Sequence, residues 1–159
     1  MTDLSLHEAI FSARAIRRLE NTPVPPAELE YLVEAATMAP SAGNMQPWSF
    51  VIVTDREQMR RMAHAHREVG RAYIRDGVLA DPDLDEDRRR VYSGAMHNVA
   101  HLDQAGAIIV ACLTMRCPDD ANVSSAMFGS IYPAVQNIIL AARARGLGTV
   151  PITLSLIHI

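Results

Sequence analysis

Apolar positions along most of the chain recur three and four residues apart, the spacing of amphipathic helices. Leu6–Arg18 predicts a first helix behind a Ser-x-x-Glu capping box. Pro26–Met38 predicts a second, because proline suits the first helical turn. A second capping box, Thr54 with Glu57, predicts a third helix that ends near Gly77. The longest pattern predicts a helix from about Val123 to Arg145 with Gly146 as its left-handed cap, and its many small residues favour close approach of another helix.

Two short apolar runs interrupt this helical pattern. Trp48–Val53 and Ala107–Leu113 are rich in aromatic and β-branched residues and predict strands. Asp81–Arg90 is highly charged and predicts a surface segment that leads into another helix. No repeat or low-complexity segment is present, and helices outnumber strands. The expected fold class is therefore α+β.

Composition narrows the function classes. The 159 residues suggest one domain, with 49% hydrophobic and 21% charged residues. A net charge of -3 and 5% aromatic residues argue against nucleic acid and anionic membrane as partners. Cys112 and Cys117 form no CxxC pair and indicate reduced thiols. With no signal-peptide pattern and no membrane-length apolar run, a cytoplasmic protein is expected.

Two segments contain side chains that could bind a ligand. Arg14, Arg17 and Arg18 would be neighbours on a helix, and such a cluster suits a phosphate group as well as an ordinary solvated helix end. The loop from Ala39 to Trp48 gathers polar side chains around Gly43, which permits left-handed backbone. It could line the edge of a polar heteroaromatic ring, or it could simply connect a helix to a strand.

Other patterns point to no metal and no catalytic side chain. His97 and His101 are four residues apart, but a pair alone underfills a zinc site. The acidic run that starts at Asp81 lacks the glycine and the final glutamate of a calcium loop. No side chain stands out as an acid, a base or a nucleophile.

Three blocks together resemble the nitroreductase superfamily. They are RAIRRL (residues 14–19) with PVP (23–25), APSAGNMQPWSFVIV (39–53) and YPAVQNIILAARARGLGTVPIT (132–153), and the similarity covers essentially residues 6–153. The resemblance implies a central, mostly antiparallel sheet flanked by helices, with a long core helix. It also implies FMN as cofactor, bound at the interface of a homodimer.

The resemblance assigns roles to individual residues. The family often has serine where Ala15 stands, so one phosphate contact is missing, and Gln136 and Asn137 would be buried polar residues of the core helix. The implied FMN contacts are Arg14, Ala15 and Arg17 at the phosphate and ribityl chain, Pro40, Ser41, Ala42 and Asn44 at the ring held by the other subunit, and Pro151, Ile152 and Thr153 along the ring.

The implied activity is an FMN-dependent oxidoreductase that uses NAD(P)H to reduce nitroaromatic, quinone or similar electron-poor acceptors by a ping-pong mechanism. The alternative is a non-catalytic protein of the same fold that binds and sequesters flavin. We expect residues 1–153 to form a single domain that lacks the family's C-terminal segment. Residues 154–159, LSLIHI, match one reading frame of a sequencing-library adapter, so we expect a non-native tail.

Overall fold

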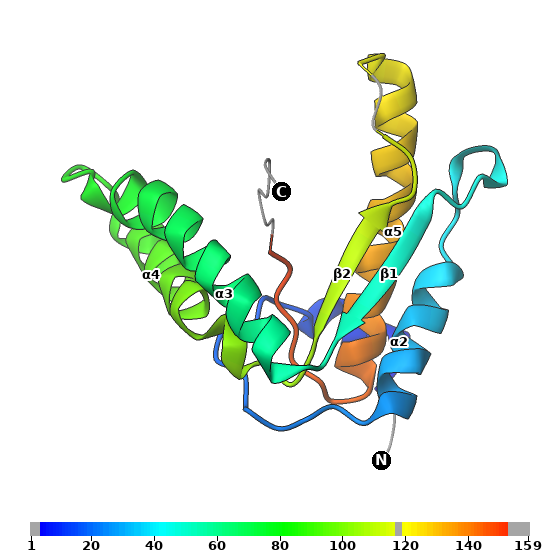
Figure 1. Cartoon of the computed structure of the whole chain (residues 1–159), viewed down its shortest axis with the longest axis horizontal. Helices are drawn as coiled ribbons and strands as arrows, with labels where there is room; N and C mark the ends of the chain where they lie inside the picture. Colours follow the sequence, from blue (N-terminus) through cyan, green and yellow to red (C-terminus); the bar gives the residue numbers. More distant parts are fainter. Residues whose placement is uncertain (1–3, 117–118, 153–159) are drawn as a thin grey trace. The chain divides into compact units, whose positions relative to one another are not determined.

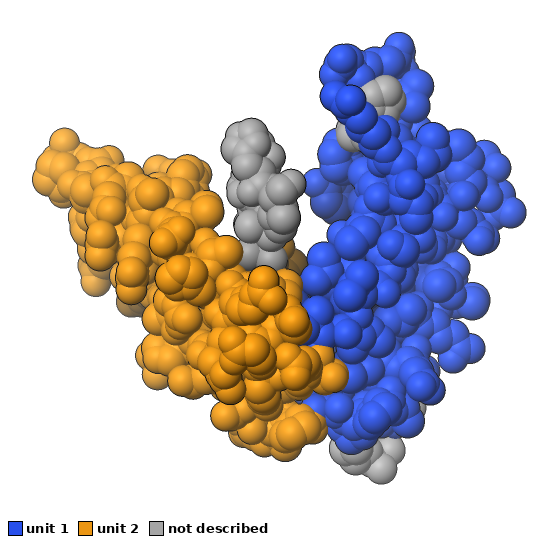
Figure 2. Space-filling view, in the orientation of Figure 1, with its two compact units in different colours: residues 1–14, 24–53, 107–149 blue, residues 15–23, 54–106, 150–159 orange. Residues whose placement is uncertain are grey.

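The computed structural model describes residues 4–116 and 119–152, which form two compact units (Figures 1 and 2). Unit 1 comprises residues 1–14, 24–53 and 107–149, and unit 2 comprises residues 15–23, 54–106 and 150–159. Cys117, Thr153 and the expected tail lie outside the described residues, and the single domain over residues 1–153 stays a prediction. The elements are α1 (Leu6–Ser12), α2 (Pro26–Thr37), η1 (Ala42–Asn44), β1 (Trp48–Val53), α3 (Arg56–Gly70), η2 (Arg71–Arg75), η3 (Val78–Ala80), α4 (Glu86–His101), η4 (Leu102–Gln104), β2 (Ile108–Leu113) and α5 (Ala121–Ala144).

The sheet of unit 1 pairs β1 with β2 in antiparallel orientation, from Trp48 opposite Leu113 to Val53 opposite Ile108. Because side chains alternate between the faces of a strand, Trp48 and Phe50 point the same way, and both belong to the core of unit 1. Val51 points to the opposite face and is 52% exposed. Both strands therefore lie where the sequence predicts them, within one residue.

Helix α5 is the long core helix that the sequence predicts, and it packs on α2 and the sheet (Figure 1). Ala134 and Ala142 on α5 are fully buried, as is Ala36 on α2, and all three belong to one hydrophobic cluster. The absence of larger side chains at these positions lets the two helix backbones come close. Gly146 caps the helix with a φ of 76°, as expected.

Polar contacts hold α5 to α1 and α2. Asn137 Nδ2 donates to the carbonyl of Ala35 over 3.0 Å. The guanidinium of Arg145 donates to both carboxylate oxygens of Glu28, over 2.9 and 2.6 Å. These hydrogen bonds hold the pKa of Glu28 below its usual value. Asn137 is half-buried with this hydrogen bond, whereas the expectation that Gln136 is buried is wrong, because its side chain is exposed.

Helix α1 is shorter than the sequence predicts. Its capping box is present, with Ser5 Oγ accepting from the Glu8 amide and Glu8 accepting from the Ser5 amide. The helix nevertheless ends at Ser12, where Arg143 Nε donates to Ser12 Oγ over 2.9 Å. Ala13 is extended, although alanine favours helix, and the chain leaves unit 1 after residue 14. Tertiary contacts override local propensity here.

In unit 2, α3 and α4 lie side by side (Figure 1). The predicted capping box at Thr54 is wrong: Asp55 caps α3 and accepts from the Gln58 amide over 2.9 Å. The α-helix also ends earlier than Gly77, because a π-helical segment, η2, replaces it after Gly70. The charged segment leads into a helix as expected, with Asp85 as the cap of α4. No described helix is long and apolar enough to cross a bilayer.

The two helices of unit 2 pack closely at Gly70. A Cβ at this position would lie 2.6 and 2.7 Å from the two methyl carbons of Val99, which is 3% exposed. Met59 and Ala63 on the same face of α3 are fully buried. His66 is also buried, and this burial lowers its pKa.

The Gly70 contact predicts a specific rescue. Gly70→Ala should lower the free energy of unfolding by about 1–3 kcal/mol, because the new methyl group overlaps Val99. The double variant Gly70→Ala/Val99→Ala should lose less than the sum of the single variants, since the valine methyls are gone. Urea unfolding of the four chains measures this coupling. Val69→Ala, next to Gly70 but exposed, is the control, and strict additivity would contradict the proposed contact.

Candidate functional site

The loop after α2 has an unusual backbone. Gly43, Asn44 and Gln46 have φ angles of 56°, 55° and 48°, in the left-handed region. Glycine adopts this conformation freely and asparagine tolerates it, but glutamine does so at a cost. Such strain persists only where surrounding contacts hold it, and it is concentrated at ligand-binding segments.

Those contacts anchor both ends of the loop within unit 1. Ser130, in the middle of α5 and 1% exposed, accepts from the Ala42 amide over 3.1 Å and donates to the Ala126 carbonyl over 2.7 Å. At the other end, Pro47 is fully buried and its carbonyl accepts from the Thr114 amide over 3.0 Å. The loop is therefore fixed to α5 and to the end of β2.

Between these anchors the loop presents polar groups. Ser41 Oγ accepts from the Gln46 amide, and Gln46 Nε2 donates to Asn44 Oδ1, each over 3.1 Å. Pro40 and Asn44 are exposed, whereas Ser41 and Ala42 are half-buried. Pro40, Ser41, Ala42 and Asn44, the ring contacts expected from this loop, thus belong to one internally hydrogen-bonded segment.

The arginines do not share a helical face, contrary to the expectation, because the chain beyond Ser12 is not helical. Arg14 is exposed at the end of unit 1, and Ala15 begins unit 2 as an exposed residue. Arg17 lies along α4, where a Cβ on Gly94 would meet its Cδ at 3.4 Å. No carboxylate of the described chain pairs with Arg14 or Arg17, so their charges stay available for an anion.

The remaining predicted contacts are in unit 2. Pro151 is exposed and Ile152 is half-buried, while Thr153 lies outside the described residues. Ser41, Ala42 and Asn44 therefore lie together in one anchored loop of unit 1. The residues expected at the flavin that belong to unit 2 are Ala15, Arg17, Pro151 and Ile152.

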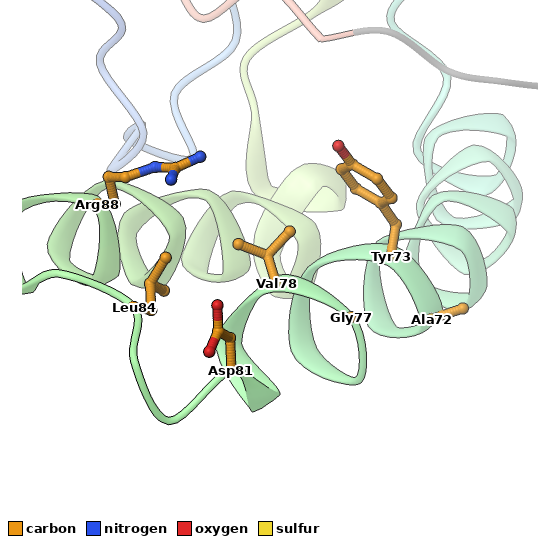
Figure 3. Close-up of a pocket in the computed structure, with 7 residues that line it drawn as sticks. All are labelled: Ala72, Tyr73, Gly77, Val78, Asp81, Leu84 and Arg88. Carbon is orange, nitrogen blue, oxygen red and sulfur yellow. The ribbon is translucent and has the colours of Figure 1, made fainter.

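Unit 2 also contains an open hollow of about 400 Å³ beside η2 (Figure 3). The Arg89 guanidinium stabilises the wall of this hollow by donating hydrogen bonds to the carbonyls of Leu79 and Asp81, over 3.3 and 2.9 Å. In Figure 3, Val78 lies between Tyr73 and Arg88. π-Helical segments such as η2 occur frequently at functional sites. The hollow is lined by Ala72, Tyr73, Gly77, Val78, Asp81, Leu84 and Arg88.

Two acidic residues of the pattern set aside in the sequence have structural roles. Asp81 accepts from the Asp83 amide over 2.9 Å, and Asp85 caps α4. Cys112 is a free thiol on β2. Among the described residues, no group of three or more histidine, cysteine, aspartate or glutamate side chains could hold a metal ion.

Sequence reasoning missed Ser130, which fixes the loop. A signal was present, because Ala126, Ser130 and Ala134 are spaced four apart and lie on one face of a helix. A hydroxyl in such a row needs a hydrogen-bond partner when it is buried. The partner, 88 residues earlier in the chain, is visible only in the fold.

Comparison with known proteins identifies the family. The sequence model of the nitroreductase family matches residues 10–157, so the chain belongs to that family. It is 31% identical over 144 residues to a protein of Archaeoglobus fulgidus named for NADH dehydrogenase and NAD(P)H nitroreductase activity. That alignment covers 89% of this chain and 63% of the relative, so the chain spans less than two thirds of its length.

Solved structures share the fold. Oxidized iodotyrosine deiodinase bound to FMN and 3-iodo-L-tyrosine superimposes with a TM-score of 0.72 at 21% identity, over 94% of this chain and 74% of that one. NADPH:FMN oxidoreductase from Vibrio harveyi, complexed with NAD⁺, gives a TM-score of 0.64 at 20% identity, over 90% and 53%. The expected nitroreductase-like α+β fold is confirmed.

The loop anchor predicts an effect of a single hydroxyl. Ser130→Ala leaves the Ala42 amide without its acceptor and should cost about 1–3 kcal/mol of stability. It should also speed hydrogen exchange in residues 39–47, measured by mass spectrometry. Ser124→Ala is the matched control, because Ser124 Oγ bonds only the Ala121 carbonyl on the same helix. Equal exchange in the two variants would show that Ser130 does not anchor the loop.

Proposed function

We propose that this chain is an FMN-dependent oxidoreductase that uses NAD(P)H to reduce nitroaromatic, quinone or similar electron-poor acceptors. The observation that carries the proposal is membership of the nitroreductase family over residues 10–157, a range that includes every proposed flavin contact. The names of the reported relatives, which mention NAD(P)H and FMN, support the same cofactor and donor.

The phosphate of FMN would be held by Arg14 and Arg17. A guanidinium binds a phosphate through two parallel hydrogen bonds, and both arginines lack a carboxylate partner within the described chain. Arg17 is half-buried and rests on Gly94, which restricts its side chain before any ligand binds. The donor set therefore fits a phosphate monoester, although Ala15 offers no hydroxyl.

The ring of FMN would lie against the loop from Pro40 to Asn44, contributed by the second subunit. The left-handed backbone and the internal hydrogen bonds orient this loop without a ligand, which reduces the entropy lost on binding. Along the other segment Pro151 has no amide hydrogen, so Ile152 or Thr153 would donate the backbone hydrogen bond to the ring.

When bound, FMN supplies the redox chemistry, and the protein supplies binding, orientation and electrostatics. Donor and acceptor would occupy the same place in turn, which is the basis of ping-pong kinetics. We assign no side-chain acid or base. The chain's contribution is the charge at Arg14 and Arg17 and the shape of the anchored loop.

A homodimer would complete this site, and α5 offers a surface for it. Phe128 and Tyr132 are 40% and 63% exposed, with stacked rings 5.8 Å apart. Exposed apolar side chains grouped on one helix indicate an association surface more than they indicate a solvated one.

The first test is flavin binding. The purified full chain should quench FMN fluorescence, and Arg17→Gln should raise the Kd by roughly tenfold or more, because a charged hydrogen-bond pair is lost. Arg61→Gln, which removes the same charge from an exposed position of α3, is the matched control. A chain that binds no FMN, or equal Kd values for the two variants, would contradict the proposed cofactor site.

Steady-state kinetics test the activity. With FMN bound, NADH or NADPH oxidation should depend on an added quinone or nitroaromatic acceptor, and double-reciprocal plots should be parallel. Stoichiometric flavin binding without acceptor-dependent turnover would favour the sequestering alternative. The Arg61→Gln chain should turn over at the unaltered rate, which checks that any loss in Arg17→Gln is local.

Sedimentation tests the dimer. The unaltered chain should sediment with twice the monomer mass, and Phe128→Glu/Tyr132→Glu should shift it to the monomer, because four carboxylates would face each other across a two-fold interface. Val69→Glu, at a 41% exposed apolar position of α3, should leave the dimer intact. A dimer that survives the double substitution would exclude this face of α5.

A further inference from the structure

A cluster of nitrogen-bearing side chains lies on α4, outside the expected flavin contacts. The rings of His97 and His101 are stacked, with centroids 4.2 Å apart and planes at 26°. His101 Nδ1 lies 2.8 Å from the His97 carbonyl. Because a carbonyl only accepts, Nδ1 carries the hydrogen, and Nε2 of His101 is the atom left for a ligand.

The segment before α2 brings Arg17 to the same helix, and the neighbouring Arg18 acts electrostatically on His97. The side chain of Arg17 lies over Gly94, three residues before His97, with its Nη1 3.8 Å from where a Cβ would stand. The neighbouring Arg18 is exposed. Burial, and then the neighbouring His101 and Arg18, lower the pKa of His97.

The cluster has no compensating negative charge. In the described chain no carboxylate lies within ion-pair distance of Arg17, Arg18, His97 or His101. Asp103, just beyond α4, is already paired with Arg67, 3.5 Å away. Arg67 reaches this end of α4 from α3 and donates to the Ala100 carbonyl over 3.2 Å. Asp103, the acidic residue nearest in sequence to His101, is therefore already paired.

We propose that Arg18, His97 and His101 form a phosphate-binding site on α4, beside the position assigned to Arg17. An anion would relieve the repulsion among these groups, and bound phosphate would favour protonation of both rings, turning bare nitrogens into donors. A metal ion fits less well, because two arginines adjoin the histidine pair and no carboxylate supplies a third ligand. The phosphate would belong to either the flavin or the nicotinamide dinucleotide, and this assignment rests on the proposed function.

Binding is tested without flavin or turnover. Inorganic pyrophosphate is titrated into the full chain, and the ring C–H signals of the histidines are followed by NMR across pH 5–8. The pKa values of His97 and His101 should rise on binding, and His97→Gln or His101→Gln should each weaken it about two- to fivefold. His64→Gln is the matched control, since His64 is exposed on α3 beside Glu68. Absence of a shift, or a response to zinc chloride in place of pyrophosphate, would overturn the site.

A second measurement identifies the source. Arg18→Gln is compared with Arg61→Gln for the Kd of FMN and for the KM of NADH and NADPH. A higher Kd for FMN assigns the site to the flavin phosphate, and a higher KM with unaltered FMN binding assigns it to the dinucleotide. If neither the Kd of FMN nor the KM of NADH and NADPH changes, the site has no role in binding flavin or dinucleotide. Failure of the unaltered chain to bind FMN would contradict the proposed function while leaving the pyrophosphate result intact.

Discussion

Close packing along α5 is the constraint on which unit 1 depends. Ala134 and Ala142 on α5 and Ala36 on α2 are fully buried in one hydrophobic cluster, and their small side chains let the two helices pack closely. The sheet covers a neighbouring face through Trp48 and Phe50. A larger residue at any of the three alanines would push the helices apart and move whatever is attached to them.

The candidate ring-binding loop is attached to α5 through Ser130. Its backbone is held at unfavourable φ angles by bonds to Ser130 and by the burial of Pro47, both of which depend on the position of α5 relative to β2. Packing energy of the core thus maintains a strained surface segment. This is the usual relation between a rigid scaffold and a binding loop.

Electrostatics organise unit 2 differently. Its carboxylates are largely used as helix caps or ion-pair partners, such as Asp55, Asp85 and Asp103. Arg17 and Arg18 have no such partner in the described chain, and Arg17 lies against α4, the helix that also carries His97 and His101. This arrangement suits phosphate-bearing ligands, which agrees with the proposed flavin and nicotinamide cofactors.

The sequence by itself determined the elements with strong local signals and the family. Both strands, α2, α5 and the glycine cap at Gly146 follow from hydrophobic period and turn chemistry, which act over a few residues. The family blocks then named the candidate contacts, and the loop among them is observed as one bonded unit. Only the tertiary structure decided that α1 stops at Ser12, that Ser130 anchors the loop and that Arg17 lies on Gly94. These outcomes depend on partners between 77 and 131 residues apart, and local propensity contains no information about such distant contacts.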